Sequence, residues 1–143
     1  MGRRAAVAAG TAGLGFASAK ALADEGATVV VCGRDRARLD DAVARLGDRA
    51  IGVVADVGNA EGAAAFVAAA TEAMGGLDIL VTNAGGPPGG NFADTPVESY
   101  PGALELNLMS VVAMCKAAVP AMQAQRWGRI VAITSLSVRQ PMP

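Results

Sequence analysis

The sequence predicts an α/β fold, a doubly wound parallel sheet of five strands within a single domain spanning residues 1–143. Short apolar runs alternate with longer segments whose apolar residues recur at helical spacing. The runs are apolar at successive positions, which is typical of strands buried on both faces. Parallel strands need crossover helices, and right-handed crossovers cover both faces of a sheet.

The first half of the chain holds two strand and helix pairs. A strand is expected over Ala5–Ala9, followed by a helix over Leu14–Glu25 that Gly26 ends. The β-branched run Thr28–Cys32 is typical of a central strand, and Asp35–Leu46 carries apolar residues on one helical face.

The alternation continues through the second half. Ile51–Ala55 predicts a strand, Asn59–Met74 a helix, and Ile79–Thr82 a fourth strand. The segment Gly85–Gly90 is too rich in glycine and proline for regular structure and predicts a loop at the carboxyl edge of the sheet, where ligands usually bind.

A long helix with a possible kink at Pro120 follows, and Arg129–Ser135 predicts the fifth strand. The apolar stripe expected to pack this helix comprises Leu104, Leu108, Val111, Val112, Cys115, Val119 and Met122.

Composition excludes several functional classes. A net charge of −1 with 17% charged and 52% apolar residues argues against disorder and against a basic nucleic-acid surface. The chain has no histidine, which excludes Ser-His-Asp hydrolysis and His-ligated zinc for this chain. Cys32 and Cys115 lack metal or redox spacing, so we expect two buried free thiols and no metal site.

The amino-terminal segment does not fit a targeting signal. The uncharged run from Ala5 to Ala19 resembles a secretory signal, but three glycines interrupt it and a strand and helix pattern continues beyond it. Lys20 and Lys116 interrupt the longest apolar stretches, so we expect no membrane span and a cytoplasmic location.

A glycine cluster lies where the first strand becomes the first helix, in the run Gly10, Thr11, Ala12, Gly13, Leu14 and Gly15. Glycines let a backbone approach a pyrophosphate, and N–H groups at a helix start stabilise an anion. A tight turn without a ligand is the alternative, but the strand and helix setting favours nucleotide binding.

Three segments together resemble the short-chain dehydrogenase/reductase family, whose fold is Rossmann-type. The segment Ala8–Gly15 resembles the family's Thr-Gly-x-x-x-Gly-x-Gly turn, with Ala8 and Ala9 in place of the threonine and first glycine. Asp56 and Val57 resemble the acidic residue and its neighbour at the adenine, and residues 82–85 resemble the Asn-Asn-Ala-Gly motif. The resemblance implies that the cofactor-binding residues after the turn are Asp56, Val57, Asn83, Ala84 and Gly85.

Two polar residues match catalytic positions of the family. Asn107 resembles the helix asparagine that positions a proton-relay water, with a satisfied helix amide as the alternative. Ser135 resembles the serine that hydrogen-bonds the reacting carbonyl oxygen. Ser137 is the other candidate for that role, and a serine capping its own turn is the structural alternative.

The end of the second strand indicates cofactor preference. An acidic residue there would hold the ribose 2′-hydroxyl of NAD, but position 33 is glycine and Arg34 follows. A guanidinium can bind the 2′-phosphate of NADP, so NADP is favoured and NAD stays open. Asp35 either caps the next helix or supplies the acidic group one position late.

The family's general acid/base, a Tyr-x-x-x-Lys pair, is expected past Pro143. We therefore hypothesise that the chain is part of a longer NADP-dependent oxidoreductase, a homo-oligomer by resemblance, that acts on a small carbonyl or alcohol substrate. The alternative is a dinucleotide-binding or dimer-forming module without turnover, which the intact mass of the protein would distinguish.

Overall fold

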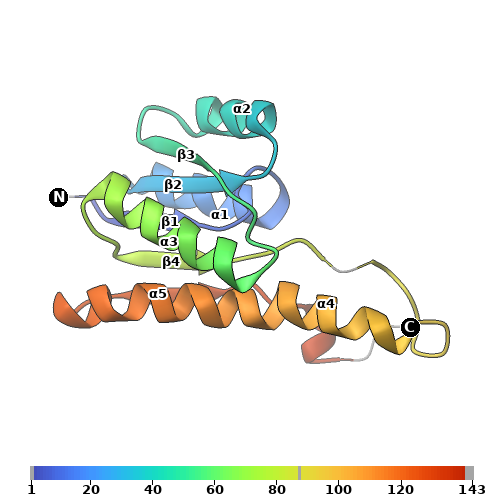
Figure 1. The fold of residues 1–143 in the computed structure, drawn as a ribbon. Helices are drawn as coiled ribbons and strands as arrows, with labels where there is room; N and C mark the ends of the chain where they lie inside the picture. Colours follow the sequence, from blue (N-terminus) through green and yellow to red (C-terminus); the bar gives the residue numbers. More distant parts are fainter. Residues whose placement is uncertain (1, 87, 141–143) are drawn as a thin grey trace.

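The computed structural model describes residues 2–86 and 88–140, and it confirms the five-stranded doubly wound sheet. All pairings are parallel, in the order β3-β2-β1-β4-β5 (Figure 1). The strands are β1 Arg4–Val7, β2 Thr28–Gly33, β3 Ala50–Val54, β4 Ile79–Thr82 and β5 Arg129–Ala132. β1 is central, and the chain moves from β3 across the sheet to β4, which creates a switch point between β1 and β4.

The helices begin and end close to the expected positions. Asp35 and Asn59 cap α2 and α3 through their side chains, and Gly75 ends α3 in the left-handed conformation that glycine favours. The α-helices are α1 Gly13–Asp24, α2 Arg36–Leu46, α3 Ala60–Met74, α4 Tyr100–Leu104 and α5 Ser110–Ala124. Shorter turns are the 3₁₀-helices η1 Val97–Ser99 and η3 Leu136–Val138 and the π-helix η2 Glu105–Met109.

Two apolar cores lie on opposite faces of the sheet. On one face, α3 and α5 pack over Ala6, Val30 and Leu80, with Phe66 at the centre. On the other face, α1 and α2 pack over alternate strand residues, which Figure 1 shows as a helical layer behind and above the sheet. Strand residues therefore face the two cores alternately, as period-two geometry requires.

The fifth strand is shorter than expected. We expected Arg129–Ser135, but β5 ends at Ala132 because its partner β4 ends at Thr82, opposite Ala132. The last ladder bond is donated by the Ile133 N–H to the Thr82 carbonyl, and the chain then leaves the sheet. Ser135 thus lies beyond the strand and not at its end.

The predicted apolar stripe of the long helix is also wrong in part. The buried face of α5 is Ser110, Met114, Ala118 and Met122, whereas Leu104, Leu108 and Val112 are exposed. Apolar residues surround this helix, so their spacing alone does not identify the face that packs on α3. Cys115 belongs to the partly buried flank, so only Cys32 is a fully buried thiol.

One helical segment among the described residues, Val97–Ala124, is long and apolar enough by length and composition to cross a membrane. The sequence led us to expect no such segment, because Lys116 interrupts its apolar stretch. One charged residue, however, does not bring the mean hydropathy of the segment below that of a possible span. Its buried residues pack into the core shared with α3, and 17% of its most apolar stretch is buried.

A charged network joins the amino ends of β1 and β4. Arg4 binds the Asp78 carboxylate through its main-chain N–H at 2.9 Å and through Nε and Nη2 at 3.0 Å. Its Nη1 donates to the Gly75 carbonyl and its Nη2 to Gln125 Oε1. These bonds satisfy a carboxylate that is almost fully buried, and they tie α3 and α5 to the sheet.

Candidate nucleotide-binding cleft

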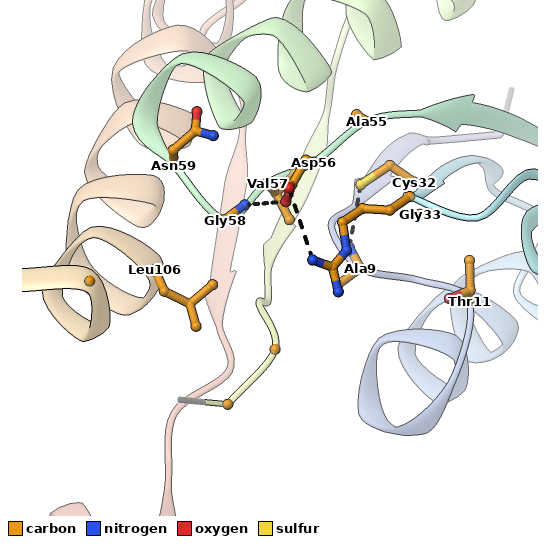
Figure 2. Close-up of a pocket in the computed structure, with 14 residues that line it drawn as sticks. Ala9, Thr11, Cys32, Gly33, Ala55, Asp56, Val57, Gly58, Asn59 and Leu106 are labelled. Atoms are coloured by element: carbon orange, nitrogen blue, oxygen red, sulfur yellow. Dashed lines mark hydrogen bonds and ion pairs between the residues drawn. The ribbon is translucent and has the colours of Figure 1, made fainter. Parts of the chain in front are cut away.

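A cleft of about 530 Å³ opens at the carboxyl ends of β1, β2 and β3. The lining is polar and small on the strand side, and Figure 2 shows it between the β1–α1 turn and the start of α3. The lining residues are Ala9, Thr11, Cys32, Gly33, Arg34, Ala55, Asp56, Val57, Gly58, Asn59, Gly85, Gly86, Gly102 and Leu106. Five of the predicted cofactor residues line this cleft, namely Thr11, Arg34, Asp56, Val57 and Gly85.

The amino end of α1 is open. Ala12 is its N-cap and supplies no side-chain hydrogen bond, and the first turn has no acidic residue. Within residues 2–86 and 88–140, no backbone carbonyl accepts from the N–H groups of residues 11–15. By contrast, α2 and α3 each have a side-chain cap. The α1 terminus is therefore the helix start that retains free donors and a positive dipole end beside the cleft.

The β1–α1 turn is closely packed. Ala9 adopts φ 47°, a left-handed conformation that is unusual for a residue with a Cβ. The Asn83 amide donates to the carbonyls of Ala8 and Ala9, at 3.4 and 3.3 Å. A Cβ at Gly15 would lie 2.3 Å from the Ala9 carbonyl oxygen, so only glycine fits between the turn and Asn83.

Two other glycines bring the turn against β2. A Cβ at Gly10 would lie 2.8 Å from Val31 Cγ1, and one at Gly33 would lie 2.5 Å from Thr11 Cγ2. Gly33 therefore makes room for the turn at the site where an acidic side chain would otherwise project. Gly13 has φ 55° with nothing within 4 Å of a Cβ position, so no other residue packs over it at the helix start.

Charged residues flank the far side of the cleft. Arg34 is largely exposed, and its Nη1 lies 4.0 Å from Asp56 Oδ2. Asp56 also accepts a 2.9 Å hydrogen bond from the Gly58 N–H, which fixes its carboxylate at the end of β3 (Figure 2). Asp35 caps α2 by accepting from the Arg38 N–H at 2.8 Å. Of the two alternatives for Asp35, the structure favours the cap.

The remaining cofactor candidates surround this arrangement. Val57 is buried in the core below Asp56, and Gly85 lines the cleft after β4. Ala84 joins Asn83 to Gly85 at the carboxyl end of β4, beside the switch point. Leu14 is a largely exposed apolar side chain on the first turn of α1.

Asn107 lies in the π-helix η2, within the otherwise continuous helix that ends in α5. Its side chain is exposed, and Nδ2 donates to the Ala103 carbonyl at 3.1 Å. A π-helical turn locally widens a helix, and such turns often accompany functional sites. The hydrogen bond of Asn107 to its own helix agrees with the structural alternative from the sequence, a helix amide whose hydrogen bonds are satisfied.

Ser135 begins the short turn η3. Its Oγ accepts from the Ser137 N–H at 3.2 Å and lies 2.7 Å from Ser137 Oγ. Both candidate serines are therefore in contact, and Ser135 caps its own turn. Among the described residues, no hydrogen bond joins Ser135 to Asn107.

Several cleft residues were not singled out from sequence. Gly102 and Leu106 reach the cleft from α4 and η2, which no local pattern indicates, whereas Gly86 lies in the loop after β4 that the sequence already places at this edge. Glu105 Oε1 accepts from the Ala60 N–H at 2.8 Å and so fastens η2 to the start of α3. Cys32 was interpreted as a buried thiol, but it also contacts the β1–α1 turn.

Known proteins resemble the chain across almost its whole length. The family model for short chain dehydrogenases matches residues 3–143. Dehydrogenase/reductase SDR family member 4 of Bos taurus is 40% identical over 143 residues, covering 97% of this chain and 51% of that protein, and the human protein of the same name matches equally. The chain spans about half the length of the curated relatives it matches.

Solved structures of similar proteins share the fold. L-sorbose reductase from Gluconobacter frateurii, solved with NADPH and L-sorbose, has a TM-score of 0.90 and 33% identity, covering 99% of this chain and 55% of that one. An F189W actinorhodin polyketide ketoreductase with NADPH has a TM-score of 0.89 and 35% identity, covering 98% of this chain and 56% of that one. The chain, with its glycine turn, its parallel sheet and this family match, belongs to the short-chain dehydrogenase/reductase family.

Proposed function

We propose that the cleft binds NADP(H), and that the chain forms the cofactor-binding part of an oxidoreductase that interconverts a carbonyl and an alcohol. The observation that carries the proposal is the open start of α1. Its free N–H groups and uncapped dipole lie beside the cleft, and Gly13 places no side chain over the helix start. These features suit a diphosphate, which needs donors and no opposing carboxylate.

The residues present fit the other end of the cofactor as well. The adenosine end would lie in the cleft near Asp56 and Val57, where a carboxylate and an apolar surface adjoin. Arg34 would bind the 2′-phosphate, because its guanidinium is exposed at the end of β2 and Gly33 adds no carboxylate that would repel it. The NADPH bound to the two reductases described above supports this choice.

The cofactor supplies a hydride at its nicotinamide ring when bound. In the proposed reaction, Ser135 would hydrogen-bond the reacting oxygen and Asn107 would hold a water near it, the roles that their family positions suggest. The π-helical turn supports the second assignment because it departs from regular helix at Asn107. Proton transfer by an acid/base pair contributes typically about 10² to 10⁴ in rate, and the family pair would stand beyond the serine turn.

Subunit pairing is a further part of the proposal. The face of the long helix that carries Leu104, Leu108 and Val112 is exposed in the described chain, and a second copy of the same helix would cover it. Sedimentation velocity of the purified protein checks this, with a dimer or larger oligomer expected and a strict monomer contradicting it.

Calorimetric titration with NADPH and NADH tests the cofactor assignment. Arg34→Ala is expected to weaken NADPH binding by at least about tenfold, because a charge-assisted contact is lost, and to leave NADH binding almost unchanged. Arg38→Ala is the matched control, since Arg38 is also an exposed arginine, on the helix that follows β2, but does not line the cleft. Equal losses for both cofactors would remove the 2′-phosphate assignment, and no binding of either would remove the proposed function.

A further inference from the structure

The conformation of Ala9 needs support from its neighbours. In the family turn that this segment resembles, glycine stands at this position, and glycine adopts positive φ without steric cost. Ala9 has φ 47° and carries a Cβ, so an isolated chain would favour other conformations for it. The surrounding residues must therefore hold the turn in the geometry that exposes its N–H groups to the cleft.

Cys32 contacts this turn through two different atoms. Its Sγ accepts a hydrogen bond from the Ala9 N–H at 3.4 Å (Figure 2), and its carbonyl accepts from the Gly10 N–H at 3.0 Å. The residue is fully buried, and burial raises the pKa of its thiol to about 12. The thiol therefore stays neutral near neutral pH, and its sulfur accepts one hydrogen bond, from the Ala9 N–H.

Asn83 holds the other side of Ala9. Its Nδ2 donates to the Ala9 carbonyl at 3.3 Å, so the peptide units before and after the Cα of Ala9 are both fixed. Gly15 allows this approach because its position has no room for a Cβ. The N–H is bound from β2 and the carbonyl from the end of β4, two strands that are not neighbours in the sheet.

We infer that Cys32 is a positioning residue for cofactor binding, which acts with Asn83 to hold Ala9 in the left-handed conformation. The inference rests on the proposed function. Cys32 compensates for the missing glycine of the turn, and its importance depends on which residue occupies position 9. With glycine at that position, the turn keeps its shape without the sulfur contact.

A double-mutant cycle on the 143-residue chain tests this dependence. Cys32→Ala is expected to weaken NADPH binding about fivefold, since one hydrogen bond to the turn is lost. In the Ala9→Gly background, the same substitution is expected to weaken binding by less than about twofold. Cys32→Ser keeps an acceptor at this site and is expected to retain most of the affinity.

Val30→Ala is the matched control. Val30 lies two residues before Cys32 on the same strand and in the same core, and it has no hydrogen bond to the turn. Its truncation is expected to lower stability in both backgrounds without any dependence on residue 9. This comparison separates a loss of core packing from a loss of the contact to Ala9.

Amide hydrogen exchange supplies a readout that needs no cofactor. Cys32→Ala is expected to accelerate exchange of the Gly10 N–H, and Ala9→Gly is expected to restore its protection. Equal affinity losses in both backgrounds, or unchanged Gly10 exchange, would overturn the role of Cys32. If the unmodified chain bound neither NADPH nor NADH, the proposed function would fail. The exchange rate of the Gly10 N–H would still show whether Cys32 holds the turn.

Discussion

Replacing Asp78 with asparagine removes the charge from the network at the amino ends of β1 and β4. The Asp78 side chain is 9% exposed and accepts three bonds from Arg4, whose side chain is 30% exposed. Removing one partner of a fully buried pair costs about 3 to 5 kcal/mol. Arg4 keeps its bonds to Gly75 and Gln125 and is partly hydrated, so we expect a loss of about 2 to 3 kcal/mol.

The pH dependence of this loss has a definite sign. The hydrogen bond from Arg4 holds the pKa of Asp78 below its ordinary value of 3.8 in the folded chain. A carboxylate with a lowered folded pKa stabilises the fold above its unfolded pKa and loses that effect as the pH falls through the folded value. The stability difference between the unmodified chain and Asp78→Asn should therefore be constant near neutral pH and shrink below about pH 4.

Urea unfolding at pH 7 and at pH 3 measures both effects. Asp24→Asn is the control, because Asp24 forms an exposed same-helix pair with Lys20 and should cost less than about 0.5 kcal/mol. An Asp78→Asn loss as small as that of the control would refute the reasoning. A difference of the same size at both pH values would show that the carboxylate charge is not the cause.

Two other substitutions test contacts that determine the fold around the cleft. Thr82→Val should stabilise the chain by about 1 kcal/mol in urea unfolding, because Thr82 Oγ1 is buried with no hydrogen-bond partner among the described residues; destabilisation would indicate that the hydroxyl is satisfied. Glu105→Ala should cost about 1 kcal/mol and increase exchange of the Ala60 N–H, because it removes the acceptor at the start of α3. Unchanged Ala60 exchange would contradict that contact.

The fold could be predicted because local signals and tertiary demands agree. The β-branched run after Gly26 forms the strand beside β1, and Asp35 and Asn59 begin their helices as caps. The end of β5 could not be predicted, because a strand pairs only as far as its neighbour β4 extends. The length of β5 therefore depends on β4, and the residues near Ser135 carry no signal for it.

The candidate site was predictable to a similar extent. The glycines of the first turn could be selected because they lie between a strand and a helix. Arg34 could be selected because it directly follows β2. The contribution of Cys32 was not apparent, since a cysteine in an apolar run is typical of core packing and its contact to Ala9 joins residues 23 positions apart. The sequence did not show which face of the long helix is exposed, because apolar residues occur all around that helix.

The two halves of the proposed function differ in how completely this chain forms them. The residues proposed for binding lie together at the carboxyl edge of the sheet, where the start of α1, Arg34 and Asp56 follow strands that belong to one sheet. The chemical half is not assembled in the same way, because Ser135 bonds to Ser137 and Asn107 bonds within its own helix. Cofactor affinity and turnover are therefore separable quantities, and a chain that binds NADPH without reducing a carbonyl would still agree with the binding site proposed for this cleft.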